Sequence, residues 1–278
     1  MVTELLVVAA LASPPQRHPP VIDVPPANEL QEMVLQDGVH AIGRVERVTD
    51  GIVTFRKISG DVLEVESSRV VSISLIDGRS VNGTFWPTDP NSTRLLLGPT
   101  GRSLKQGQAY LDIVGILPYV QVGVTDRVSI GGGTPLFFPG SERVFWVTPK
   151  VQIFAGQKTE AAIGTLHIAN VGHNSFGIAY GVLTRGSPDA AVTVGLGYSY
   201  EGDRSFGGGA PVGIVGGERR VSHMVKLITE NYVFSGGGIA SAGVRLLGER
   251  WAVNLGVTAT FADRYFFAAP TVRTTWKF

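Results

Sequence analysis

Few residues in this 278-residue chain are of the types that carry out covalent or metal chemistry. The chain has no cysteine, which excludes disulfide frameworks, thiolate metal sites and cysteine nucleophiles. The glycine run 131–133 is not followed by the Gly-Lys-Ser/Thr sequence of a phosphate-binding loop. The runs 207–209 and 236–238 are interpreted as loop glycines. No cofactor or metal site is predicted.

Histidine is the next candidate for chemistry. His167 lies between apolar neighbours and could face an interior, but a lone histidine is more often a hydrogen-bonded structural residue than a catalyst. His173 lies in a predicted outer loop, with no carboxylate spaced to orient its ring. Catalytic triads are assembled in space, so a serine–histidine hydrolase built across strands is kept as an alternative. Because no catalytic motif occurs, the chain is predicted not to be an enzyme.

Polar side chains on alternating segments after residue 107 are a better lead. Their positions in the alternation predict that they point into the lumen of a barrel. Charges of both signs there can pair and close the lumen, or line a narrow aqueous path, and we favour pairing. The lumen-lining candidates are Asp112, Gln121, Lys150, Gln152, Lys226, Glu230, Arg245, Asn254, Arg273 and Lys277.

The composition narrows the architectures that can hold these residues. Charged residues make up only 17% of the chain, where soluble domains usually carry about 25%. After the N-terminus no apolar run approaches the roughly 18–20 residues that a membrane helix needs. The 36 glycines favour β-structure over helix. The chain is therefore expected to be either a large soluble β-protein or a set of strands that each present one face to lipid.

The N-terminal region resembles an export signal followed by a linker. Residues 5–12 are apolar and end in Ala-Leu-Ala, as at a secretory cleavage site, so 1–12 is predicted to be a signal peptide. The segment before this run carries Glu4 and no Lys or Arg, which suggests that the true start could lie upstream of Met1. Residues 13–27 contain six prolines and are expected to form an extended linker.

Residues 28–82 show short alternating segments separated by turns. Asp-Gly pairs at 37–38, 50–51 and 77–78, and Ser-Gly-Asp at 59–61, mark the turns. We predict a small SH3-like or Sm-like β-module here. Sm-like barrels often bind RNA, but a net charge of +1 without a basic stripe argues against nucleic acid. Residues 83–106 are predicted to be a connector, in which Leu95-Leu96-Leu97 forms either a short strand or a plug.

The alternation is clearest at the C-terminus. Between 251 and 261 the odd positions are apolar with an aromatic residue at each end, whereas the even positions are small or polar. That is the pattern of a strand with one face towards lipid. We therefore expect Leu255 and Val257 on the lipid face, and Asn254 and Thr258 on the lumen face. A charge should be tolerated better on the lumen face if the lumen is wet.

About twelve such strands are predicted between 107 and 278. Short polar turns are expected at 125–127, 157–159, 186–189, 218–220 and 248–250, and longer connections include 201–209 and 262–268. An even count places both ends of the barrel on the short-turn side, which is periplasmic in such barrels. Residues 219–232 also fit a helical period, but their β-formers favour a strand. The strands are predicted near 108–115, 118–125, 128–137, 144–155, 160–169, 174–185, 189–200, 209–217, 221–234, 237–247, 251–261 and 269–278.

The chain also resembles a group of uncharacterised bacterial outer-membrane β-barrel proteins that have a short β-rich N-terminal module. The segments that carry this resemblance are 123–133, 147–150, 177–181 and 247–253. The final alternating strand, with Trp276 and the terminal Phe278, resembles the signature that the barrel assembly machinery recognises. The resemblance implies location and fold, and no reaction.

The sequence thus predicts an all-β protein, with a C-terminal antiparallel transmembrane β-barrel of about 12 strands at 107–278 after a small SH3-like or Sm-like domain. We expect a bacterial outer-membrane protein with a structural or narrow-pore role and its N-terminal module in the periplasm. Its expected partners are outer-membrane lipid and the barrel assembly machinery, and a periplasmic partner of the module is left open. The alternatives are a soluble exported β-sandwich or binding module, and a lipid-modifying barrel enzyme.

Overall fold

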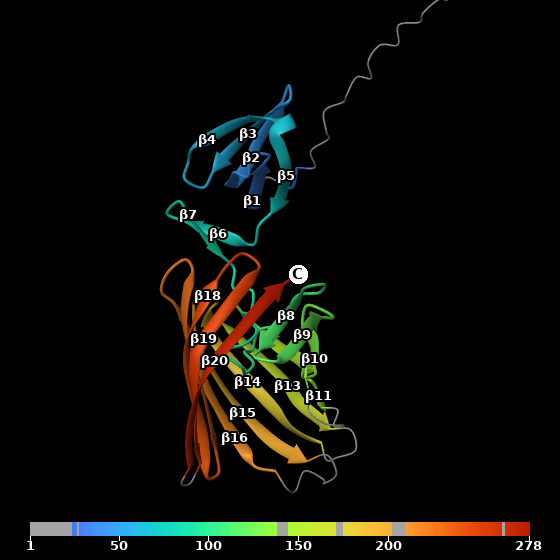
Figure 1. Cartoon of the computed structure of the whole chain (residues 1–278), viewed down its shortest axis with the longest axis vertical. Helices are drawn as coiled ribbons and strands as arrows, with labels where there is room; N and C mark the ends of the chain where they lie inside the picture. Colours follow the sequence, from blue (N-terminus) through green and yellow to red (C-terminus); the bar gives the residue numbers. More distant parts are fainter. Residues whose placement is uncertain (1–23, 27, 138–143, 171–174, 202–208, 263–264) are drawn as a thin grey trace, which may run out of the picture. The chain divides into compact units, whose positions relative to one another are not determined.

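The computed structural model describes residues 24–278 except 27, 138–143, 171–174, 202–208 and 263–264 (Figure 1). The predicted signal peptide and most of the predicted linker lie outside these residues. The chain divides into two compact units after Ile76. In the described part, no helix is long and apolar enough to cross a membrane.

The first unit is a five-stranded antiparallel sheet with the strand order β4-β3-β2-β1-β5. Met33, Val53 and Phe55 have no exposed surface and form the centre of its core. Glycines with positive φ stand at three of the predicted turns, Gly38, Gly51 and Gly60, where only glycine adopts the backbone conformation without strain. The elements are β1 (Gln31–Leu35), β2 (His40–Thr49), β3 (Ile52–Lys57), β4 (Val62–Glu66), the 3-10 helix η1 (Ser67–Arg69) and β5 (Val70–Leu75).

The second unit begins with a hairpin, β6 (Gly78–Val81) and β7 (Thr84–Pro87), which the sequence pattern had divided between module and connector. Asn82 and Gly83 both have positive φ, as a tight Asn-Gly hairpin turn requires. The Asp-Gly pair at 77–78 is therefore not a turn, because Gly78 already pairs with Pro87 in the hairpin. Residues 88–106 follow as a segment without named strands, here called the connector.

The remaining strands form one closed antiparallel barrel, because β9 at one end of the sheet pairs with β10 near the other. β11 and β12 lie end to end in one position between β10 and β13, so thirteen strands fill twelve positions. The predicted twelve-stranded architecture is confirmed. The strands are β8 (Ala109–Val114), β9 (Leu117–Gly123), β10 (Val128–Gly133), β11 (Val144–Val147), β12 (Lys150–Ala155), β13 (Thr159–Asn170), β14 (Phe176–Ser187), β15 (Ala190–Glu201), β16 (Pro211–Arg220), β17 (Val225–Phe234), β18 (Gly237–Leu247), β19 (Trp251–Ala262) and β20 (Tyr265–Lys277).

Several details differ from the sequence prediction. The predicted strand 144–155 is two strands, β11 and β12, and Gly186 and Ser187 of the predicted turn at 186–189 belong to β14. Residues 218–220 belong to β16, and the turn lies at 221–224, where Val221 N–H donates to Val225 O. Gly237 and Gly238 are in β18, and only Gly236 adopts the positive φ of a turn. The predicted long connection at 262–268 is mostly strand, because the aromatic residues that begin β20 pair with the end of β19. The alternative helix at 219–232 is wrong, since these residues form β16, β17 and the turn between them.

The two ends of the barrel differ in the range of their connection lengths: at one end all have two to four residues, whereas the other end has two-residue turns after β8 and β17 together with connections of nine or more residues after β10 and β15. One end, here called the short-turn end, carries the turns that follow β9, β12, β14, β16 and β18. Phe278 N–H donates to Ala109 O at 2.8 Å, so the first and last barrel strands also meet there. This confirms that both ends of the barrel lie on the short-turn side.

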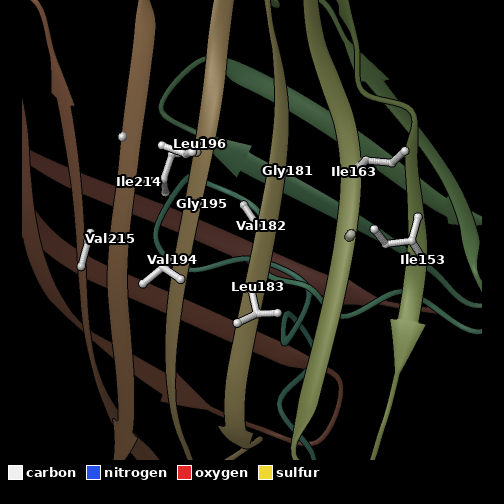
Figure 2. Close-up of a pocket in the computed structure, with 12 residues that line it drawn as sticks. Ile153, Ile163, Gly181, Val182, Leu183, Val194, Gly195, Leu196, Ile214 and Val215 are labelled. Carbon is white, nitrogen blue, oxygen red and sulfur yellow. The ribbon is translucent and has the colours of Figure 1, made fainter.

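The two faces of the barrel wall follow the predicted alternation. On β19, Leu255 and Val257 are 46% and 54% exposed on the outer face, whereas inward-facing Asn254 is 2% exposed. A shallow apolar depression lies on this outer face, and Gly181 and Gly213 are among its lining residues. Figure 2 shows the apolar side chains around it. Six exposed side chains around it are Ile153, Ile163, Leu183, Val194, Leu196 and Val215.

Candidate functional site

The connector lies inside the barrel and fills part of its lumen. Its residues bond to inward-facing side chains on opposite sides of the wall, including Lys150 on β12, Arg245 on β18 and Arg273 on β20. A segment that reaches strands on all sides can lie only in the lumen. Leu95 and Leu96 are buried and pack against Ile228 of β17, so the plug is the correct one of the two predicted alternatives for this leucine run.

Asp89 is the central anion of the plug. Its Oδ2 accepts hydrogen bonds from Lys226 Nζ at 2.5 Å and from Arg245 Nη1 at 2.8 Å, and its Oδ1 accepts the Asn91 N–H at 2.9 Å. Burial alone would raise the pKa of Asp89, but the two neighbouring cations hold it well below its ordinary value. The carboxylate is therefore ionised and fixes the connector to β17 and β18.

Arg102 is the matching cation at the other end of the plug. It forms ion pairs with Glu218 on β16 and with Glu160 on β13, the latter at 3.1 Å. Glu218 also accepts a bond from Lys226 at 2.9 Å, which joins this cluster to Asp89. The continuous ion-pair chain is Arg245, Asp89, Lys226, Glu218, Arg102 and Glu160.

Two further wall residues hold the connector through its backbone. Glu230 accepts the N–H groups of Leu97 and Gly98 at 2.9 and 2.8 Å. Lys150 donates to the carbonyl oxygen of Arg102 at 2.6 Å and to that of Thr93 at 3.3 Å. Each buried charge without a side-chain counter-ion thus has backbone partners, which offset the cost of removing it from water.

The side of the barrel near the first strand is also filled. Arg273 pairs with Asp112, with Nε 2.7 Å from Oδ2, and donates to the carbonyl oxygen of Leu96. Gln121 accepts from Tyr110 at 2.5 Å and donates to Ser129 at 2.8 Å. These contacts leave no room for a wide aqueous path at this level of the lumen.

Nine of the ten lumen-lining candidates lie buried around the connector, each at most 5% exposed. The tenth, Lys277, lies at the short-turn end, where its Nζ bonds to Asp77 at 2.8 Å. The geometry corresponds to the paired, closed alternative rather than the aqueous path. The nine are Asp112, Gln121, Lys150, Gln152, Lys226, Glu230, Arg245, Asn254 and Arg273.

The other predicted residues lie outside the lumen. His167 faces outward, on the same face as Ile163, and its ring stacks on Tyr200 with centroids 5.9 Å apart and Nδ1 3.0 Å from the hydroxyl. The expectation that it could face the interior is wrong, because β13 directs its even positions inward. Trp276 and Phe278 are exposed on the outside, and their role in assembly stays a prediction. His173 and Gly207–Gly208 lie outside the described residues.

Sequence analysis missed five charged residues of this site: Asp89, Arg94, Arg102, Glu160 and Glu218. Three lie in the connector, where no strand period indicates which way a side chain points. Glu218 was assigned to a turn, so its face was not considered. Glu160 lies at an even position of β13, as does inward-facing Leu166, so the alternation of this strand could have identified it. The sequence did contain one indication that the connector binds inside the barrel. Its three charged residues named above flank the apolar run 95–97, in a segment without the alternation of a strand.

No family model and no curated protein matches this chain. Among solved structures, the KdgM porin in complex with disordered oligogalacturonate has a TM-score of 0.48 and 7% identity, over 62% of this chain and 98% of the porin. OmpTdeltaL8, a loop L8 deletion mutant of OmpT, an outer membrane protein of Vibrio cholerae, has a TM-score of 0.31 and 12% identity, over 90% of this chain and 96% of that protein. At these scores the likeness assigns no substrate to this chain.

Proposed function

We propose that this chain is a β-barrel protein of the bacterial outer membrane with a closed or very narrow lumen. Its role would be structural or one of restricted transport, without catalysis. The observation that carries this proposal is the connector, which is bound inside the barrel by the ion-pair chain centred on Asp89. Among the described residues, no histidine lines the lumen and no group of three His, Asp or Glu could hold a metal ion.

The outer face of the barrel supports the membrane location. Large apolar side chains are exposed along most of the long strands, including β15, β17, β19 and β20, whereas soluble proteins rarely expose contiguous apolar patches of this extent. Aromatic residues mark the two ends of this face: Trp251 pairs with Trp276 at one end, and Phe261 with Phe266 at the other. Aromatic girdles at two levels are typical of transmembrane barrels. A soluble β-sandwich would have the opposite arrangement, with charges outside and apolar residues within.

The filled lumen supports a closed rather than a wide pore. Barrels of about eight strands are filled by side chains, and wide aqueous channels need about 16–18 strands. Twelve strands fall between these limits, so whether the pore is open depends on what fills the lumen. Here the connector fills the lumen at the level of the charged wall residues, and these charges bind the connector.

We further propose that the first unit is an SH3-like or Sm-like module in the periplasm. Its five-stranded order and the 3-10 helix before the last strand support this assignment. The second unit begins at Asp77, which bonds to Lys277 at the short-turn end of the barrel. Short turns are periplasmic in outer-membrane barrels, so the chain would leave the barrel on that side.

Single-channel recording in planar bilayers tests the closed lumen. The wild-type protein is expected to insert with little or no steady conductance, whereas Asp89→Ser combined with Arg102→Ser should release the connector and give discrete open events. Asp77→Ser is the matched control, because it removes a carboxylate whose ion pair lies outside the plug, and it should behave as wild type. A large steady conductance of the wild-type protein would contradict the proposal.

A further inference from the structure

The lumen contains a second region that the connector does not fill. It is a partly enclosed cavity of about 330 Å³ between the connector and the end of the barrel opposite the short turns. Its floor includes Leu97 and Pro99 of the connector. Its wall is formed by inward-facing residues of β13, β14, β16, β17 and β18, most of them apolar: Leu166, Ile178, Val212, Ile214, Phe234 and Ile239. We call this cavity the chamber.

This apolar inner wall contrasts with the wall around the connector, where many buried inward residues are charged or polar. The interior of membrane barrels is generally polar, because it contacts water or polar protein groups. An apolar face towards an empty lumen would be exposed to water without benefit. The wall of the chamber is therefore suited to an apolar occupant that the chain itself does not supply among its described residues.

Two polar groups of the chamber are not fully used by the protein. Arg94 lines it, and its three bonding nitrogens donate to Tyr110 Oη at 3.0 Å, to Leu97 O at 3.0 Å and to Tyr119 Oη, all neutral acceptors. No described carboxylate forms an ion pair with Arg94. Tyr180 also lines the chamber, and no hydrogen bond joins its hydroxyl to a described residue. Tyr232, by contrast, is bonded to Glu230 at 2.5 Å.

We propose that the chamber binds a single-chain amphiphile with a monoanionic head, of the fatty-acid class. The hydrocarbon chain would lie against the apolar wall, and the head would accept hydrogen bonds from the Arg94 guanidinium and the Tyr180 hydroxyl. Ligand sites of this kind are mostly apolar with a few convergent polar groups, and their volumes begin near 300 Å³. The inference goes beyond the proposed pore role and rests on it only for the membrane as the source of the ligand.

The chemistry of the lining discriminates against other ligands. A sugar would need many side-chain hydrogen bonds, which aliphatic and phenyl groups cannot provide. A cationic amphiphile would be repelled by Arg94, and a neutral alcohol would leave this guanidinium without a counter-ion. A carboxylate is attracted by Arg94 and supplies its counter-ion. Its charge-assisted hydrogen bond to arginine is also roughly twice as strong as a neutral one.

Binding of ¹³C-carboxyl dodecanoate to the full chain in an uncharged maltoside detergent tests the proposal by NMR. Saturable binding of about one dodecanoate per chain is expected, with dodecyltrimethylammonium unable to displace it. Arg94→Gln should weaken dodecanoate binding by about tenfold or more, the loss expected for one hydrogen bond to a charged group, and should leave dodecanol binding unchanged. Ile178→Trp should abolish the binding of both by filling the chamber.

Two control variants separate the chamber from the rest of the barrel. Val194→Trp adds the same bulk on the outer face, and Arg219→Gln removes an exposed cation of β16 at the short-turn end of the barrel. Both should bind dodecanoate as the wild type does. Folding of each variant is checked on gels, where a folded barrel migrates differently before and after heating. If Arg94→Gln does not fold by this criterion, the result for Ile178→Trp decides the test. Non-saturable uptake that is equal in all variants, or equal binding of the cationic probe, would overturn the proposal. Bilayer conductance tests the closed lumen separately. If the wild-type protein has a closed pore but does not bind dodecanoate, the chamber proposal is wrong and the closed-lumen proposal stands.

Discussion

The lumen has two halves, one filled by the connector and one that contains the chamber. The same strands form both, but their inward side chains are polar and bonded in the first half and mostly apolar in the second. Towards the short turns, the inward positions of β16, β17 and β18 are Glu218, Lys226 and Arg245, and each binds the connector or a neighbouring charge. Further along β16 and β17 the inward positions become Ile214 and Phe234, which line the chamber. The inward face of a barrel strand therefore does not have one polarity, because its side chains match whatever occupies the lumen at that level.

This comparison explains where stability and binding are expected to reside. The filled half contains coupled buried charges, for which the loss of one partner is costly. The chamber contains no ion pair among its lining residues, so a substitution there leaves no buried charge without its partner. We expect substitutions in the first half to affect folding, and substitutions in the second half to affect ligand binding.

The largest effect is expected for Asp89→Ala. It leaves Lys226 and Arg245 buried without their shared counter-ion, and breaking a buried pair in this way costs about 3–5 kcal/mol. The free energy of unfolding in lipid vesicles measures the loss, and the folded fraction on unheated gels gives a simpler readout. Ile239→Ala in the chamber is the comparison, and it should cost much less. Equal losses would mean that the two halves are not distinct.

A second test uses one strand, β19, to compare three environments. Leu255→Arg places a charge towards lipid and should cost about 2–4 kcal/mol if this position lies near the midplane. Thr258→Arg points inward beyond the plug, where the lumen is less filled, and should cost less. The sequence predicts that Asn254→Arg costs less than Leu255→Arg if the lumen is wet, but Asn254 is buried and accepts a bond from Arg245 at 2.7 Å. A second cation there should be as damaging as Leu255→Arg.

The measurement is again the free energy of unfolding in vesicles for the three variants. Damage at 254 and 255 with tolerance at 258 would support both the lipid face and the division of the lumen. A harmless Leu255→Arg would contradict the lipid-facing assignment of this strand. Equal damage at 254, 255 and 258 would indicate that the lumen is occluded along its whole length.

The alternation of residues such as those from Trp251 to Phe261 was sufficient to predict the barrel, because a strand between lipid and lumen must change polarity at every residue. The predicted lumen candidates followed from the same alternation. The connector could not be placed in this way. Asp89 and Arg102 have no periodic pattern around them, and their partners on β16, β17 and β18 are more than a hundred residues away. The chamber was missed because apolar residues on the inner face weaken the alternation instead of producing it.

The smallest and most direct contrast compares the same chemical change in the two halves. Tyr110 and Tyr180 are both inward-facing tyrosines of the wall. The Tyr110 hydroxyl is buried and bonds to Gln121 at 2.5 Å and to Arg94 at 3.0 Å, so Tyr110→Phe leaves buried groups without partners and should cost about 1–3 kcal/mol. The Tyr180 hydroxyl bonds to no described residue, so Tyr180→Phe should change the free energy of unfolding by no more than about 0.5 kcal/mol. The same variant should weaken dodecanoate binding measurably, because it removes a donor to the head group. If Tyr180→Phe destabilises the barrel as much as Tyr110→Phe does, the chamber is a packed part of the core and not a binding site.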